Sequence, residues 1–290
     1  MLHPASGIRH PTSCILHPAS SSSMNNFLKQ FAPPILKRIV KYRFKEGWHG
    51  NYPNWEAAKT VTTGYEAGSI IDRVRTSALK AKRGEVAFER SALTYEHPEV
   101  NFQILTALLF AAIHNHNRLV VLDYGGSLGS VYYQMKPFLS GISSIRWCIV
   151  EQPAFVEVGR KEFEDEELHF FNSPEECLEV YEPTLILFSS SLQYIPDPYK
   201  VIEELFKYEI PYFLLDRTAF VEQETDRLTI QKVPPAYYDA SYPCWFLSRP
   251  KFLNFMSSHY GLKGEFKNEI YLQLGLEQLR YEGMWFERRK

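Results

Sequence analysis

The sequence predicts an α/β protein with a doubly wound, mostly parallel sheet, an antiparallel C-terminal edge and an N-terminal helical cap. Short, continuous apolar runs recur after residue 118, as expected for parallel strands buried on both faces. Stretches with helical spacing separate these runs. The chain has 290 residues, of which 45% are hydrophobic and 23% charged, enough for one large domain with a cap.

The first predicted parallel strand, Leu119–Leu122, follows a helix over Asn101–His116 whose apolar residues share one side. A glycine-rich turn and a helix over Ser130–Leu139 come next, and another helix covers Phe155–Phe163. The alternation of strands with helices is typical of a doubly wound sheet. The other four strands are predicted at Ile145–Val150, Leu168–Phe171, Thr184–Phe188 and Tyr212–Leu215.

After the fifth strand the pattern becomes antiparallel. Arg227–Lys232 alternates between apolar and polar residues, as a half-buried strand does. Arg249–Tyr260 is predicted as a helix that Gly261 ends. Leu262–Phe266 and Arg280–Glu287 are predicted to form a closing hairpin.

Three regions are expected along the chain. Residues 1–23 repeat His-Pro and Ser, which predicts a disordered tail upstream of a true start at Met24. Residues 24–117 form a basic segment and the helical cap, and residues 118–290 form the main Rossmann-like domain. Within the second region, Asn25–Lys45 carries six basic residues and no acidic one. This segment is favoured as a cap helix, with peripheral contact with an anionic membrane as the alternative.

Composition excludes several classes of function. A net charge of -2 argues against electrostatic binding of nucleic acid. The longest apolar run, Leu105–Ile113, has about half the length of a membrane-spanning helix. Four widely spaced cysteines form no CxxC pair, which predicts neither a disulfide framework nor a metal site and favours a reducing, cytoplasmic setting. The oligomeric state does not follow from the sequence.

The most informative motif is the loop Asp123–Gly129, which follows the first predicted strand. Ligands of such sheets bind at the carboxyl ends of the strands, where glycines let the backbone approach them. A dinucleotide fingerprint ending at Gly129 needs glycine at positions 124 and 126, and only Gly126 is present. The Asp123 carboxylate would repel a pyrophosphate but attract the cationic groups of S-adenosyl-L-methionine, which is therefore the predicted cofactor.

Further cofactor residues are expected where the next strands end. Glu151 follows the second strand and is placed to accept hydrogen bonds from ribose hydroxyls, although a solvated acid is the alternative. Asn172 follows the third strand and is expected near the adenine, or simply in a turn. The predicted cofactor-binding residues are Asp123, Tyr124, Gly125, Gly126, Ser127, Gly129, Glu151, Asn172 and Ser190.

The loop Asp123–Gly129 resembles the cofactor loop of class I S-adenosylmethionine-dependent methyltransferases, with Glu151 as the ribose-binding acid. The run Ser190–Pro198 resembles the loop after their fourth strand. Ser127 stands where the wider superfamily usually has its middle glycine. From Met24 to the end, the chain is also similar to methyltransferases encoded among bacterial surface-polysaccharide (O-antigen-like) genes. That resemblance rests on Trp48-His49-Gly50, Trp55-Glu56-Ala57, Gly64-Tyr65, the Asp123–Gly129 loop, Leu215–Thr218, Asp226–Pro234 and Ser241-Tyr242-Pro243.

Methylation of a hydroxyl requires removal of its proton, usually by histidine. No histidine falls in a predicted strand-end loop, because His169 lies inside the third strand and is expected to pack in the core. His49, in an aromatic loop of the cap, is therefore the nominated base. Arg217 is expected to hold an anionic or polyhydroxylated acceptor through its guanidinium, unless a structural carboxylate engages it. The predicted catalytic residues are His49, Tyr194 and Arg217, and the predicted acceptor-binding residues are Tyr65, Gln231 and Tyr242.

The resulting hypothesis is a transferase that methylates a hydroxyl of a sugar or glycan precursor in surface-polysaccharide biosynthesis, with a small-molecule or glycan acceptor. One rival is an NAD-dependent oxidoreductase of nucleotide sugars, against which counts the absence of a Tyr-xxx-Lys pair at the predicted site. The other rival is a catalytically inactive methyltransferase-like scaffold for polysaccharide assembly. Ser127 and the missing obvious base keep the scaffold open.

Overall fold

A computed structural model describes residues 47–64, 68–233, 240–275 and 277–290. The predicted tail over residues 1–23, the basic segment Asn25–Lys45 and the acceptor candidate Tyr65 lie outside these residues. No helix among the described residues is long and apolar enough to cross a membrane.

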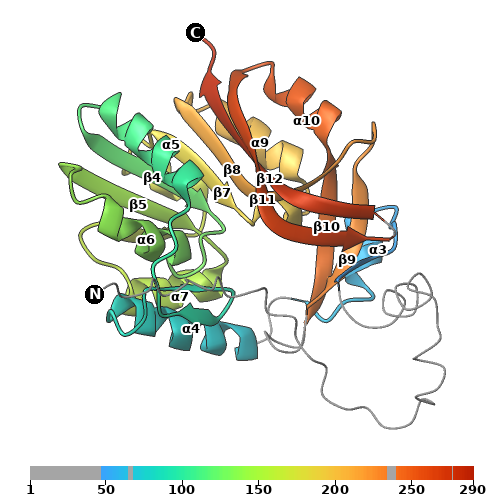
Figure 1. The fold of residues 1–290 in the computed structure, drawn as a ribbon, viewed down its shortest axis with the longest axis horizontal. Helices are drawn as coiled ribbons and strands as arrows, with labels where there is room; N and C mark the ends of the chain where they lie inside the picture. The colour runs from blue at the N-terminus through green and yellow to red at the C-terminus, as the bar shows by residue number, and fades with distance from the viewer. Residues whose placement is uncertain (1–46, 65–67, 234–239, 276) are drawn as a thin grey trace, which may run out of the picture. The chain divides into compact units, whose positions relative to one another are not determined.

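Five parallel strands form one half of the large sheet, in the order β6-β5-β4-β7-β8 (Figure 1). The chain builds the sheet outward from β4 to β6 and then returns to add β7 on the other side of β4. This return creates a topological switch point between β4 and β7, where ligands of doubly wound sheets bind. The bounds are β4 (Arg118–Tyr124), β5 (Ser144–Val150), β6 (Leu168–Phe171), β7 (Leu185–Ser189) and β8 (Tyr212–Val221).

Helices cover both faces of this sheet, and neighbouring residues of β4 belong to different cores. Val121 packs in one cluster with α4, α5, α6 and α7, whereas Leu122 packs in another with α8, α9 and α10. Successive side chains of a strand point to opposite faces, so both faces are apolar. The helices are α4 (Gly68–Lys82), α5 (Phe102–Ile113), α6 (Ser130–Met135), α7 (Pro153–Glu162), α8 (Pro174–Leu178), α9 (Pro198–Phe206) and α10 (Arg249–Met256), with 3₁₀ turns η1 (Lys136–Phe138) and η2 (Leu192–Tyr194).

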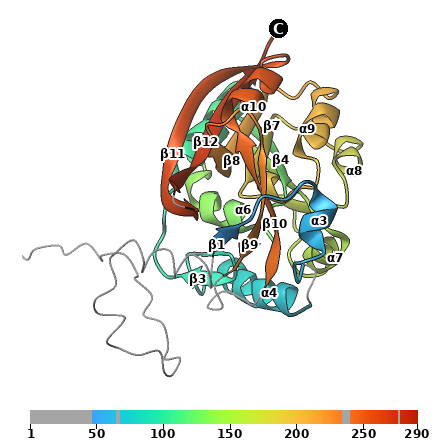
Figure 2. The same cartoon turned by 90° about the vertical axis from the view of Figure 1, so that its right-hand side faces the viewer.

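Beyond β8 the sheet continues as antiparallel strands and then closes on itself. β12 (Glu277–Arg288) pairs with β8, and β11 (Tyr260–Leu274) pairs with β12. Three shorter strands follow, and the last of them, β10, pairs in parallel with the far end of β8 at Leu247 and Phe220. The remaining strands are β1 (Gly47–His49), β9 (Arg227–Lys232) and β10 (Ser241–Ser248), which Figure 2 shows together beside α3 (Trp55–Lys59).

The closed ring β8-β12-β11-β1-β9-β10 has its own small core. Trp48 packs edge-on against Phe246 and Tyr281, with ring centroids 6.0 and 6.4 Å apart. Ala219, Val221, Leu272 and Leu274 belong to the same cluster. The ring is therefore a packed element attached to the parallel sheet through the shared strand β8.

The structure corrects the predicted fold in four places. The fifth parallel strand does not end before Asp216, because β8 runs on to Val221, and β10 was not predicted at all. The cap is not purely helical, since β1 joins the ring and β2 (Phe88–Arg90) pairs with β3 (Leu93–Tyr95). The helix α10 ends at Met256, and Gly261 lies in β11. These differences arise from long-range strand pairing, which overrides local propensity.

Candidate functional site

The loops after β4 and β7 touch at the switch point. The N–H of Gly125 donates to the Val150 carbonyl at 2.8 Å, which ties the loop to β5. Gly125 has a φ of +75°, and a Cβ placed on it would lie 2.5 Å from Cβ of Ser191. Ser191 also donates its hydroxyl to the Tyr124 carbonyl. Only glycine fits the close approach that brings these two loops together.

Asp123 lies directly beneath the loop and is fully buried. Its Oδ2 accepts a 2.9 Å hydrogen bond from Nε1 of Trp147, while Oδ1 has no hydrogen-bond partner among the described residues. A Cβ on Gly126 would approach Cγ of Asp123 to 2.6 Å, so the loop closes over the acid. Burial raises the pKa of Asp123 to about 7, against the opposing effect of the Trp147 hydrogen bond.

Glu151 joins the end of β5 to the same loop. Its Oε1 accepts from the Ser127 N–H at 3.2 Å, and its Oε2 accepts from the Gln152 N–H at 2.8 Å. Burial raises the pKa of Glu151, and these two hydrogen bonds oppose the rise. The charge of Glu151 also raises the pKa of Asp123, so the two acids interact. A carboxylate offers about four acceptor positions, which leaves Glu151 able to accept further hydrogen bonds.

Two residues near the end of the loop have left-handed backbones. Ser127 has a φ of +57° and Gly129 has a φ of +97° at the N-cap of α6. Serine pays a steric cost in this conformation that glycine does not. Position 127 therefore has the left-handed backbone conformation that glycine favours, but it carries a serine side chain.

Tyr124 and Ser190 lie on opposite sides of the switch point. The Tyr124 ring stacks on Phe188 of β7, with centroids 5.0 Å apart. Ser190 has a φ of +60° and donates its N–H to the Asp216 carbonyl at 2.8 Å. Both residues are therefore part of the site framework.

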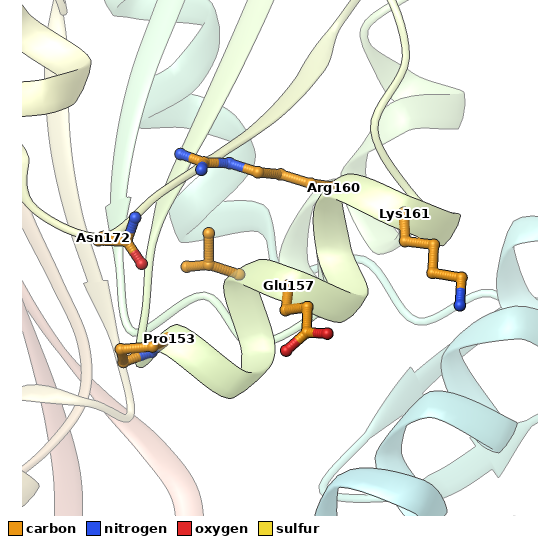
Figure 3. A pocket seen from close by; sticks show the side chains of 6 residues that line it. Pro153, Glu157, Arg160, Lys161 and Asn172 are labelled. Carbon is orange, nitrogen blue, oxygen red and sulfur yellow. The ribbon is translucent and has the colours of Figure 1, made fainter.

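Asn172 follows β6 and is hydrogen-bonded to α8. Its backbone N–H and its side-chain amide both donate to the Glu176 carboxylate, at 3.0 and 3.3 Å. The exposed side chain lies across a shallow pocket of about 470 Å³ from α7, beside Pro153 and Arg160 (Figure 3). A contact between Asn172 and an adenine stays a prediction.

Arg217 sits at a β-bulge in β8. Asp216 and Arg217 of β8 lie opposite a single residue of β12, Gly283. Arg217 has a φ of +49°. Such bulges re-aim a side chain. Nε of the Arg217 guanidinium lies 3.2 Å from Oδ2 of Asp216. Its Nη2 donates a hydrogen bond to Oγ of Ser189 at 2.9 Å.

Asp216 is fully buried and collects several partners. It accepts from Oγ of Ser189 at 2.7 Å and from Nδ2 of Asn101 at 3.2 Å. Asn101 is also the N-cap of α5. Asp216 is thus a structural carboxylate that engages Arg217. The Arg217 side chain is still 11% exposed, so its edge can meet a ligand.

Three of the predicted residues, from separate segments of the chain, contact one another. The Tyr194 hydroxyl donates to Oε1 of Gln231 at 2.7 Å, and the Tyr194 and Tyr242 rings meet edge to face at 5.1 Å. Burial raises the pKa of Tyr194 well above its ordinary value, so the phenol is a donor at neutral pH and not a base. We call Tyr194, Gln231 and Tyr242 the tyrosine cluster.

His49 does not join the tyrosine cluster. In β1, Trp48 lies opposite Gln231, whereas His49 lies opposite Ile230. Adjacent side chains of a strand point to opposite faces, so His49 faces away from Gln231. Among the other histidines, His169 is partly buried within β6, and its imidazole contacts the Tyr181 hydroxyl at 3.1 Å.

Glu89 of β2 is a site residue that the sequence did not reveal. It is 1% exposed, accepts from the hydroxyl of Ser130 and accepts from the Ala92 N–H at 3.3 Å. Burial raises the pKa of Glu89 to about 7. Ser130 begins α6, so Glu89 secures the helix that follows the glycine loop. An isolated acid in a three-residue strand gives no pattern that predicts this contact.

Comparisons with known proteins give only distant similarity. No protein-family model and no curated protein sequence matches the chain. Similar solved structures include 1,6-didemethyltoxoflavin-N1-methyltransferase of Burkholderia thailandensis with bound S-adenosylhomocysteine, at 13% identity and a TM-score of 0.40, covering 79% of this chain and 99% of that one.

Two further structures are similar at the same level. An S-adenosylmethionine-dependent methyltransferase of Clostridium acetobutylicum has 9% identity and a TM-score of 0.43, covering 65% of this chain and 92% of its own. Magnesium protoporphyrin IX methyltransferase of Synechocystis, with bound S-adenosylmethionine, has 10% identity and a TM-score of 0.41, covering 76% and 96%. At such low similarity, function has to be judged from the residues of this chain.

Proposed function

We propose that the protein is an S-adenosyl-L-methionine-dependent methyltransferase. The observation that carries the proposal is the link between Glu151 and the Ser127 N–H, with Asp123 beneath the same loop at the end of the neighbouring strand. Two acids at adjacent strand ends, joined by a tight glycine loop, fit a ligand with ribose hydroxyls and positive charge. They do not suit a pyrophosphate, which argues against the dinucleotide alternative.

The donor and acceptor set supports this cofactor. Glu151 retains acceptor capacity for the ribose hydroxyls, and Oδ1 of Asp123, which has no hydrogen-bond partner among the described residues, is a second acceptor under the loop. Gly125 and Gly126 let the loop pack tightly on Ser191 and Asp123, which holds the loop at the end of β4. When bound, S-adenosylmethionine supplies a methyl group on a sulfonium.

We propose the tyrosine cluster and Arg217 as the acceptor side of the site. The Tyr194 phenol, the Gln231 amide and the Arg217 guanidinium are uncharged or cationic hydrogen-bonding groups, which suits a hydroxyl-rich acceptor. Tyr194 and Arg217 would orient the acceptor, and positioning is a large part of catalysis for an in-line displacement. His49 has no part in this proposal because it faces away from the cluster.

The acceptor we propose is a hydroxyl of a sugar or glycan precursor, in surface-polysaccharide biosynthesis. The polar cluster supports a hydroxylated acceptor, and the sequence resemblance supports the setting.

Calorimetry on the full chain with S-adenosylhomocysteine tests the cofactor. We expect saturable binding with a dissociation constant in the micromolar range, roughly -8 kcal/mol, and a rise in melting temperature. NAD is the matched comparison ligand. Binding of NAD in place of S-adenosylhomocysteine, or of neither, would overturn the proposal.

A further inference from the structure

A second pocket lies away from the glycine loop, on the outer side of the ring. It has a volume of about 340 Å³, within the range of small-molecule sites. Five parts of the chain line it: the start of α3, the start of α9, the residue before β9, the strand β10 and the helix α10. Its characteristic residues are Asn54, Trp55, Asp197, Tyr199, Asp226 and Trp245.

Aromatic side chains form one wall of this outer pocket. The Trp55 and Trp245 rings lie 6.3 Å apart at an angle of 28°. Both indoles are half-buried, and Nε1 of Trp245 donates to the Pro196 carbonyl at 3.3 Å, which fixes that ring. Fixed aromatic faces bind apolar ligand surfaces at a low cost in conformational entropy.

Polar groups in the outer pocket are also fixed in place. Asp226 accepts from the Tyr199 hydroxyl at 3.0 Å and from the Ser248 N–H at 2.7 Å, and it pairs with Lys251. Asp197 caps α9 through Oδ1, and Asn54 caps α3 through Oδ1. Each cap uses only part of the side chain, so Oδ2 of Asp197 and Nδ2 of Asn54 can still bind a ligand.

The charge of the outer pocket restricts its ligand. Two carboxylates, Asp197 and Asp226, face one ammonium group, and Lys251 is already paired with Asp226. The balance disfavours phosphate and other anions. A pyranose ring presents C–H groups on its faces and hydroxyls around its edge, which match aromatic faces and planar oxygen and amide groups respectively.

We propose that the outer pocket binds a neutral sugar residue. Side chains of β10 alternate across the strand, so Tyr242 and Trp245 face opposite sides of it. The loop after β7 likewise carries Tyr194 of the tyrosine cluster and, two residues on, Pro196 of the outer pocket. The sugar subsite and the proposed acceptor site are therefore formed by opposite sides of β10 and by the same loop after β7. The evidence for the sugar subsite is its own lining residues and does not depend on the methyltransferase proposal.

Tryptophan NMR tests this inference on the full chain. The protein has five tryptophans, so ¹⁵N-tryptophan labelling gives a small set of indole signals. The variants Trp55→Phe and Trp245→Phe each remove one indole signal, which assigns that signal, and each keeps an aromatic ring in the pocket. The probes are maltose, cellobiose, lactose and N,N′-diacetylchitobiose, each raised to about 20 mM, above the weak millimolar affinities of a small open site.

We expect at least one disaccharide to shift the Trp55 and Trp245 signals saturably, while those of Trp147 and Trp285 stay fixed. Trp245→Phe should weaken that binding by at least about fivefold, and Trp285→Phe, a half-buried indole elsewhere, should leave it unchanged. The inference fails if no sugar shifts both signals, if only Trp48 inside the ring responds, or if a proline-rich peptide binds there and sugars do not. Calorimetry with S-adenosylhomocysteine on the same sample reports separately on the methyltransferase proposal.

Discussion

The indole of Trp147 on β5 donates a 2.9 Å hydrogen bond to the carboxyl group of Asp123 on β4, and both side chains are fully buried. Trp147 is the hydrogen-bond partner that the described part of the chain gives Asp123 beneath the glycine loop, where burial favours the neutral form of the acid. Because the pKa of Asp123 is raised, the free energy of unfolding depends on pH. The glycine loop packs directly on this carboxyl group at Gly126.

Asp123→Asn should stabilise the protein relative to wild type as the pH rises. The pKa of Asp123 is about 7 in the folded protein and 3.8 ordinarily, so only the folded state holds this proton between those values. Stability from this group is therefore full below pH 4 and is lost as the pH rises to 7. Asparagine stays neutral, so the difference in unfolding free energy should shift in favour of the variant by about 2–3 kcal/mol from pH 5 to pH 8.

Urea unfolding at both pH values measures this shift. Asp72→Asn, an exposed carboxylate on α4, is the matched control. Equal changes in the two variants would mean that burial of Asp123 is not the cause.

Gly126→Ala should disrupt the cofactor loop. The new Cβ would lie 2.6 Å from Cγ of Asp123, so the acid or the loop must move. We expect a loss of about 1–3 kcal/mol in stability and at least about tenfold weaker binding of S-adenosylhomocysteine. Gly141→Ala is the control, because a Cβ there meets nothing within 4 Å. Similar effects in both variants would refute a specific clash at Asp123.

Glu151→Ala should weaken binding of S-adenosylhomocysteine by about 10- to 100-fold, since charge-assisted hydrogen bonds are worth about 1.5–3 kcal/mol. The variant also frees the Ser127 N–H from its 3.2 Å acceptor. Calorimetry measures the change, and Glu166→Ala removes an exposed acid before β6 as a control. Unchanged affinity in Glu151→Ala would remove this residue from the proposed ribose site.

Ser127→Gly should keep cofactor binding and raise stability by about 0.5–1 kcal/mol, because glycine adopts the left-handed conformation without steric cost. The φ of Ser127 is +57°. Ser127→Ala separates the two contributions, since it removes the hydroxyl but keeps the strained backbone. Thermal unfolding measures the stability of both variants. If Ser127→Ala is stabilised as much as Ser127→Gly, the gain comes from loss of the hydroxyl and not from relief of backbone strain.

The sequence by itself determined the parallel half of the protein. Each strand from β4 to β7, and the first part of β8 up to Leu215, is a short apolar run. Helices are also predicted after β4 and β5, so these signals are local. The positions of Asp123 and Glu151 followed from one rule of topology, that parallel strands end at the same edge. Both acids do meet the glycine loop there.

Only the tertiary structure decided the closed ring, the bulge at Arg217, the contact of Glu89 with Ser130 and the orientation of His49. Each depends on which distant strand pairs with which, and in what register. A shift of one residue in register moves every side chain of a strand to the opposite face. Local patterns of hydrophobicity do not encode that choice, because it is made by packing between segments that are far apart in the chain.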